Sequence, residues 1–273
     1  MALAIRKCLI IAIGLGFIES FVFFTMEGTV NWSDIILHFG FSEIEIIFVY
    51  LIELSIRLLP IILFQAFFGT YIYQRFCSAS VYYFSRCPNR IRWFLKEASK
   101  LYLLAFIYPF LMVLTTIVVV PFIKTIHFDH VAVLIFIYYL LIHSMWLFIT
   151  TLMINVLSIK FDSGLGFVIV TGLQITSVTL MLLWEKVWPL VDNPSVAFHS
   201  LLLKFNPIAH LILPWHSSKN ADINNLINQY NLSFDLNESV LLFLLLSSMA
   251  LGLGCLIIKQ QEWIVLNRES GGI

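Results

Sequence analysis

Residues 131–157 read VAVLIFIYYLLIHSMWLFITTLMINVL, a stretch of 27 residues that contains no Asp, Glu, Lys or Arg. A helix needs roughly 20 mostly apolar residues to cross about 30 Å of hydrocarbon. The richness of this stretch in Leu, Ile, Phe and Val favours a helix, because a membrane barrel would show short alternating segments. Five further windows meet the same requirement, at about 8–24, 46–71, 101–123, 165–185 and 240–258. We therefore expect one domain, 1–273, that is an all-α polytopic membrane protein with six transmembrane helices.

The composition excludes most other classes of protein. Of the 273 residues, 60% are hydrophobic and 12% are charged, and the mean hydropathy is +0.93. An ordinary soluble domain carries about 25% charged residues, so this chain has too few charged residues to cover a surface that faces water. Sixteen basic residues balance sixteen acidic ones, which leaves no net basic charge for nucleic acid. The expected surroundings are a lipid bilayer.

The distribution of Lys and Arg predicts the orientation. With the N-terminus inside, eleven of them fall on the cytoplasmic side and four outside, while Arg57 lies within the second window. The first outer loop, 25–45, has four acids and no Lys or Arg. We expect both termini to face the cytoplasm.

The inner loop between the second and third windows, residues 72–100, is the most informative polar segment. Pro88 should divide it into two short helices, because proline disrupts a helix interior. Two interpretations stay open: a docking element whose aromatics fill a groove on a cytoplasmic partner, or an anchor whose aromatic and arginine side chains rest at lipid headgroups. The candidate docking residues are Tyr82, Tyr83, Phe84, Arg86, Arg90, Arg92 and Trp93.

Three charged residues fall inside the predicted spans, where each costs at least a few kcal/mol. Glu53 and Arg57 are spaced i, i+4, so one helix face can neutralise its own pair. Glu19, in the first span, has no such partner on its own helix. For the pair, a packing role competes with a transport role. For Glu19, the alternatives are the outer interface or a contact with Arg57 across the bundle.

The outer segment 186–239 separates the fifth and sixth spans. Its apolar stretch Val196–Trp215 is interrupted by Asn206-Pro207 and by Pro214. Such a stretch suits short re-entrant or interfacial helices before the last span better than a full crossing.

Motifs for catalysis are incomplete. Glu53-Leu-Ser-Ile-Arg57 matches part of the E-E-x-x-x-R signature of CAAX-type intramembrane proteases, but Ile52 replaces the first Glu and no F-x-x-x-H follows. No G-x-x-x-x-G-K-[ST] loop occurs, and no histidine or cysteine spacing suits zinc. We expect no catalytic residues, no metal and no bound cofactor in this chain.

The order of these segments resembles the ABC-2-type permeases, the membrane subunits of ABC exporters. That family has six spans with both ends inside, a coupling helix between spans two and three that docks on the ATPase, and re-entrant helices before span six. The corresponding segments here are 72–100 and 196–215, and the resemblance covers nearly the whole chain. The chain's size and the loop that begins Tyr82-Tyr83-Phe84-Ser85-Arg86 are similar to bacterial permeases near peptide-antibiotic and bacteriocin gene clusters.

The resemblance implies a permease subunit in a bacterial cytoplasmic membrane that exports a peptide or hydrophobic compound. Its partners would be a second permease copy or homologue and an ABC ATPase subunit that holds ATP and Mg²⁺. It also favours docking over anchoring for the loop 72–100. The competing hypotheses are a stand-alone membrane immunity or binding protein and an intramembrane protease.

Overall fold

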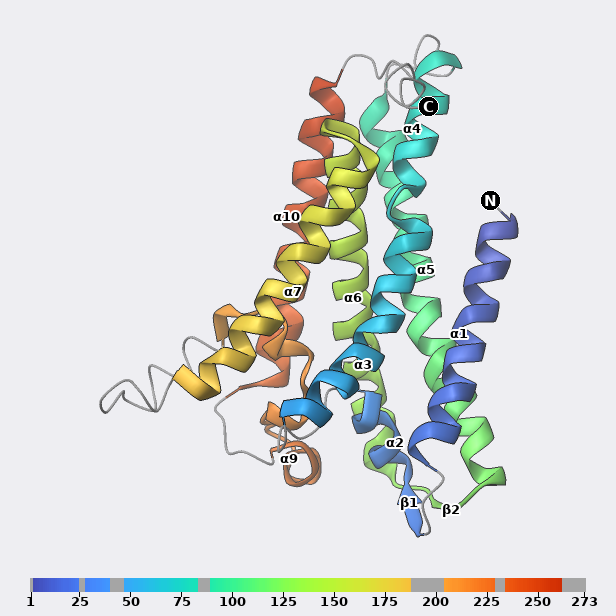
Figure 1. Ribbon diagram of the computed structural model, residues 1–273, viewed down its shortest axis with the longest axis vertical. Helices are drawn as coiled ribbons and strands as arrows, with labels where there is room; N and C mark the ends of the chain where they lie inside the picture. The colour runs from blue at the N-terminus through green and yellow to red at the C-terminus, as the bar shows by residue number, and fades with distance from the viewer. Residues whose placement is uncertain are drawn as a thin grey trace.

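The structure, a computed structural model, describes residues 2–24, 28–39, 47–82, 89–187, 204–228 and 234–261; at 2–4, 23, 47–57, 79–82 and 181–187 it describes the backbone alone. The chain is mostly helical (Figure 1). Its elements are α1 (Ala2–Phe23), β1 (Thr29–Asn31), α2 (Trp32–Phe39), α3 (Ile47–Phe68), α4 (Tyr71–Tyr82), α5 (Arg90–Val119), η1 (Val120–Phe122), β2 (Thr125–His127), α6 (His130–Lys160), α7 (Ser163–Val187), η3 (Ala209–Leu211), η4 (Leu213–Trp215), α9 (Ala221–Ile227) and α10 (Leu236–Gln260).

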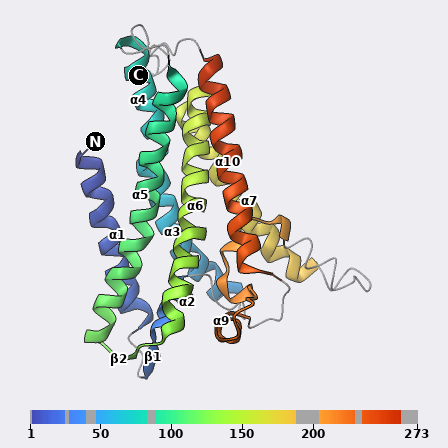
Figure 2. The ribbon, with the colours of Figure 1, turned by 180° about the vertical axis from the view of Figure 1, so that it is seen from behind.

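The long helices run between two ends of the molecule, and helix α6 lies at the centre. It packs against α2, α3, α4, α5, α7 and α10, while α1 packs along α5 (Figures 1 and 2). One end, called here the α4–α5 end, carries the end of α4, the start of α5, the α6–α7 connection and the end of α10. The other, the β1–β2 end, carries the two short strands and α9.

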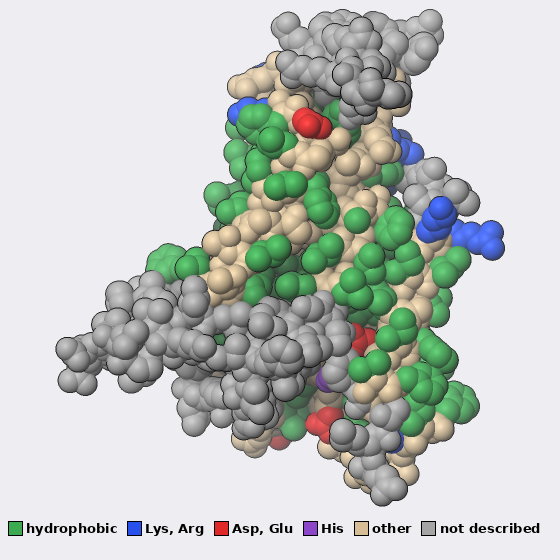
Figure 3. All heavy atoms as spheres, in the orientation of Figure 1, with side chains coloured by type: hydrophobic (Ala, Val, Ile, Leu, Met, Phe, Trp, Pro, Cys, Tyr) green, Lys and Arg blue, Asp and Glu red, His purple; other side chains and the backbone are tan. Residues whose placement is uncertain are grey.

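Within the described residues, four helices are long and apolar enough to cross a membrane: Arg90–Phe122, His130–Lys160, Ser163–Leu180 and Leu236–Gln260. They coincide with the third to sixth predicted spans. The outward faces of these helices carry exposed apolar side chains, as lipid contact requires (Figure 3). Helices α1 and α3 occupy the first and second predicted spans and run beside the others. Six crossings and the direction of the termini stay predictions.

The inner loop differs from the sequence expectation. The predicted second span, 46–71, ends at Phe68, where Gly69 and Thr70 interrupt it before α4 begins. The second half of the loop is no separate short helix, because α5 begins at Arg90 and continues for 30 residues. Asn89 starts it by accepting a hydrogen bond from the Arg92 backbone N–H at 3.1 Å. Pro88, which was expected to divide the loop, lies outside the described residues.

The described parts of the outer segments contain regular secondary structure. Within 25–45, β1 pairs in parallel with β2, and the Ser33 N–H donates to the Asp129 carboxylate at 3.1 Å. These contacts hold α2 against α6, where five of its eight side chains are buried. In the outer segment 186–239, the described part contains the short helices η3, η4 and α9. That these are re-entrant or interfacial stays a prediction.

Two glycines set close helix contacts. A Cβ on Gly16 would collide with the Met112 carbonyl of α5, and Thr116 donates a hydrogen bond to the Gly16 carbonyl at 2.9 Å. A Cβ on Gly254 of α10 would collide with the Phe94 ring of α5. The first and last helices therefore each pack tightly on α5.

Candidate functional site

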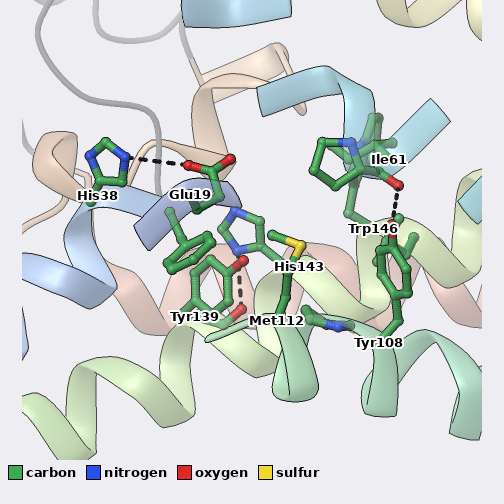
Figure 4. A pocket seen from close by; sticks show the side chains of 12 residues that line it. Glu19, His38, Ile61, Tyr108, Met112, Tyr139, His143 and Trp146 are labelled. Carbon is green, nitrogen blue, oxygen red and sulfur yellow. Dashed lines mark hydrogen bonds and ion pairs between the residues drawn. The ribbon is translucent and has the colours of Figure 1, made fainter. Parts of the chain in front are cut away.

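A cavity inside the bundle lies between α1, α2, α3, α5 and α6 (Figure 4). About 40 Å³ of it is open to the centres of water molecules. A water needs roughly 10–15 Å³ on that measure, so the cavity has room for about three waters or a slim organic group. Its lining residues are Glu19, His38, Phe39, Pro60, Ile61, Tyr108, Pro109, Met112, Tyr139, His143, Trp146 and Leu147.

Glu19 supplies the one carboxyl group among the described residues of the lining. It is 6% exposed, and its Oε2 lies 3.6 Å from Nε2 of His38 on α2. The Phe24 ring meets the His38 ring edge-on, with centroids 5.2 Å apart. The sequence marked Glu19 as an intramembrane charge, but it placed His38 in a loop. Only the folding of α2 against the bundle brings the two together.

Aromatic and imidazole groups of α6 form the opposite wall. His143 Nδ1 faces the Tyr139 carbonyl at 3.0 Å, so that nitrogen carries the proton, and the two rings stack with centroids 4.1 Å apart. One turn further along α6, Trp146 is buried, and its indole N–H has no acceptor among the described residues. Tyr108 donates its hydroxyl to the Pro60 carbonyl at 3.1 Å. None of these residues is marked by a sequence motif; the signal that could have found them is a polar group within an apolar span.

Most of the described residues that line the cavity are aromatic or aliphatic. None of these described lining residues is a Ser, Thr or Cys. Among the described residues, no three His, Cys, Asp or Glu side chains are grouped as a metal site would need.

A second polar centre holds the interruption between α3 and α4. The fully buried Asn155 of α6 accepts from the backbone N–H groups of Ile72, at 2.7 Å, and Tyr73, at 3.2 Å. Its amide donates to the carbonyls of Phe68 and Thr151, each at 2.8 Å. A single side chain of the central helix thus provides hydrogen-bond partners for backbone groups at the end of α3 and at the start of α4.

An ion cluster joins α4 to α5 near the α4–α5 end. Glu97 is 3% exposed and accepts from Tyr71 at 2.9 Å and from Arg75 and Lys100, each at 2.7 Å. A carboxylate with three donors is well satisfied, and two of those donors come from α4. Tyr71 and Arg75 thus link α4 to α5 through Glu97.

The structure places the predicted docking residues in different settings. Arg90 donates to the Gln261 carbonyl at the end of α10, at 2.7 Å, and Trp93 packs on Phe76 of α4 with ring centroids 6.0 Å apart. Arg92 is exposed. Arg90 and Trp93 thus have structural contacts, while Arg92 is open to a partner. Tyr83, Phe84 and Arg86, and the side chain of Tyr82, lie outside the described residues.

The intramembrane pair Glu53 and Arg57 falls in α3, where the backbone places them one helical turn apart as expected. Their side chains lie outside the described residues.

A third polar cluster lies in the outer segment, against the start of α10. The hydroxyl of Ser239 lies 2.8 Å from His210 Nδ1 and 2.8 Å from His216 Nε2. The other ring nitrogens face the carbonyls of Lys204 and Ile212 and so carry protons. Burial lowers the pKa of His210, and it lowers the pKa of His216 to about 4. The hydroxyl group of Ser239 has one proton, so it donates a hydrogen bond to only one of the two neutral rings.

The basic residues whose side chains the structure describes are unevenly divided between the ends. Nine of them lie toward the α4–α5 end and three toward the β1–β2 end. The nine are Arg6, Lys7, Arg75, Arg90, Arg92, Lys96, Lys100, Lys160 and Lys259, and the three are Lys124, Lys204 and Lys219.

No protein-family model matches the sequence, and no curated protein or solved structure is significantly similar to it. A functional argument for this chain rests on its own geometry.

Proposed function

We propose that this protein is the membrane subunit of an ATP-driven exporter in a bacterial cytoplasmic membrane, with the ATPase on a separate chain. The observation that carries the proposal is the α4–α5 pair, linked through Glu97, at the basic end of the bundle. The helix from Arg90 to Phe122 has 33 residues, which span about 50 Å at 1.5 Å per residue. The hydrocarbon core is about 30 Å thick, so about 20 Å of this helix must lie outside it.

The positive-inside rule favours the α4–α5 end as the cytoplasmic end, since most described Lys and Arg lie toward it. A cytoplasmic ATPase would then meet the start of α5 and the end of α4. The exposed Arg92 near this tip offers a charge for docking. Export of a peptide or hydrophobic compound, and pairing with a second permease copy, belong to the same proposal.

The internal contacts supply a route from this tip to the cavity. Glu97 binds α4 to α5, and Asn155 binds the start of α4 to the central helix α6. Helix α6 also carries Tyr139, His143 and Trp146 of the cavity wall. A push on the tip would therefore reach α6 through these two contacts and move it against its neighbours.

Co-purification tests the proposal. A tagged chain taken from its native host should retain an ATPase subunit, and the purified complex should hydrolyse ATP. Arg92→Glu should weaken retention of the ATPase at least tenfold, because it reverses an exposed docking charge without touching the bundle. Lys219→Glu, an equally simple reversal at the other end, is the matched control. Arg90 is unsuitable, since its change would also release α10.

Two outcomes would contradict the proposal. If the chain purifies without any ATPase, the alternative of a stand-alone immunity or binding protein takes its place. If Arg92→Glu and Lys219→Glu both leave the complex intact, the α4–α5 tip is a headgroup anchor instead of a docking site.

A further inference from the structure

The cluster of His210, His216 and Ser239 joins the outer segment to the start of the last long helix. Two neutral rings present their accepting nitrogens, His210 Nδ1 and His216 Nε2, to one hydroxyl oxygen, each at 2.8 Å. The other ring nitrogens donate to the carbonyls of Lys204, at 2.9 Å, and Ile212, at 2.8 Å. Since the Ser239 hydroxyl donates to one ring only, the second short contact places two lone pairs against each other.

One added proton would complete this cluster. A protonated ring donates to the Ser239 oxygen, and the Ser239 hydroxyl then donates to the ring that stays neutral. Burial lowers the pKa of His210, but the Glu238 carboxylate favours its charged form, while Lys204 opposes it. Lys204 and Glu238 are themselves paired at 3.3 Å. With the first proton on His210, all three groups stay bonded to one another.

A second added proton has the opposite effect. The two facing nitrogens share one oxygen at 2.8 Å, so they lie no more than twice that distance apart. Both histidines are buried, and the Phe234 ring packs against them at centroid distances of 4.5 and 5.1 Å. Like charges this close repel strongly where water is excluded. Burial above all, and then the neighbouring His210, lower the pKa of His216 to about 4.

Few other charges reach the cluster from the described elements around it. Asp235, just before α10, favours the charged form of His216. Lys219 and Asp222, next to and within α9, are exposed. Helix α6 has no Asp, Glu, Lys or Arg over 131–157, and none occurs among the described side chains of α7. Two positive charges in the cluster would therefore be poorly compensated.

We propose that His210, His216 and Ser239 form an acid-operated latch, which holds the outer segment on α10 with no added proton or with one, and which a second added proton opens. The part that is released is 204–216, with η3 and η4. The latch is a property of the chain alone. That acid reaches it from the outer side rests on the proposed orientation.

Proton linkage gives the size of the effect. An imidazole in water titrates near pH 6.5, whereas the pKa of His216 in the closed cluster is about 4. The closed form is therefore fully favoured above pH 6.5, and each pH unit below that value favours the open form by up to tenfold until pH 4 is reached. Between pH 7 and pH 4.5, opening should become at least tenfold more frequent.

Hydrogen–deuterium exchange of the purified full-length chain in nanodiscs, read by mass spectrometry, tests the latch. The reporters are the backbone N–H groups of Leu211, Ile212 and Trp215, which are bonded within the outer segment. After correction for intrinsic exchange, their protection should fall at least tenfold from pH 7 to pH 4.5, while that of α6 stays unchanged. His216→Gln should remove this response, and His127→Gln, the same change at an exposed histidine, should retain it.

Three results would overturn the proposal. They are an unchanged or higher protection of the outer segment in acid, an equal loss of protection in α6, or an undiminished response in His216→Gln. The first two need only the wild type, so a His216→Gln chain that fails to fold leaves the test decisive. The exporter proposal is tested separately, because retention of an ATPase does not depend on this cluster.

Discussion

Replacing Asn155 by Ala should loosen the junction between α3, α4 and α6. The change removes the partner of two backbone N–H groups, at Ile72 and Tyr73, and of the Phe68 carbonyl. The bond to Thr151 stays within α6 and is left out of the sum. An unsatisfied buried group costs about 1–3 kcal/mol, while hydrogen bonds in membrane helices average about 0.6 kcal/mol. Three such losses therefore predict a destabilisation of about 2–5 kcal/mol.

The assay is thermal unfolding in nanodiscs, followed by circular dichroism. For a chain of this size, about 1 kcal/mol shifts Tm by roughly 2–4 °C, so Asn155→Ala should lower Tm by about 5–15 °C. Asn237→Ala is the matched control, because Asn237 is exposed and its side chain accepts one hydrogen bond, from Tyr138. A Tm for Asn155→Ala within 2 °C of that control would show that other contacts hold the interruption.

Three more predictions concern the helix contacts, the outer segment and the ion cluster. Gly16→Ala should destabilise by about 1–3 kcal/mol, because its methyl group meets the α5 backbone, whereas Gly14→Ala has open space and should be neutral or slightly stabilising in the same unfolding assay. Burial lowers the pKa of His216 to about 4, below its ordinary 6.5, so its contribution to stability is complete above pH 6.5 and is lost as the pH falls toward 4. Tm should accordingly drop between pH 6.5 and pH 4 by the equivalent of up to about 3 kcal/mol. A rise in Tm would show that protonation of His216 completes the Ser239 hydrogen bonds and that this gain exceeds the cost of burying the charged imidazolium. Glu97→Gln should cost about 1–3 kcal/mol, while Glu238→Gln in its exposed pair should cost less than about 1 kcal/mol; equal losses on denaturation would contradict the burial argument.

The long apolar segments were predictable from the sequence because hydropathy is a local property. The windows 101–123, 131–157, 165–185 and 240–258 coincide with helices of spanning length, although α5 begins well before its window, at Arg90. The polar first part of α5 was expected to form a short helix separate from the third span, because it lies in the polar loop 72–100. The Asn89 cap and a run free of proline up to Pro109 explain why it is continuous.

The cavity was predictable only in part. Glu19 could be singled out because a carboxyl group is unusual in a span, but His38 and Trp146 could not, since neither belongs to a motif. Their meeting depends on α2, which reads as part of a polar outer loop and is held in place by the β1–β2 pairing. The inner loop 72–100 shows the opposite case. From the sequence, Arg90 and Trp93 were expected to lie at the surface, yet both have partners within the fold.

The helical character of the chain, its suitability for a membrane and its polarised positive charge can be read from the amino-acid order, because length, hydropathy and charge are counted along the chain. Which polar groups meet depends on how the helices pack. Asn155 lies more than 80 residues from the α3 and α4 backbone groups it satisfies, and Glu19, His38 and Trp146 come from three different helices. Contacts of this kind depend on how helices pack across the bundle, and no local pattern encodes them.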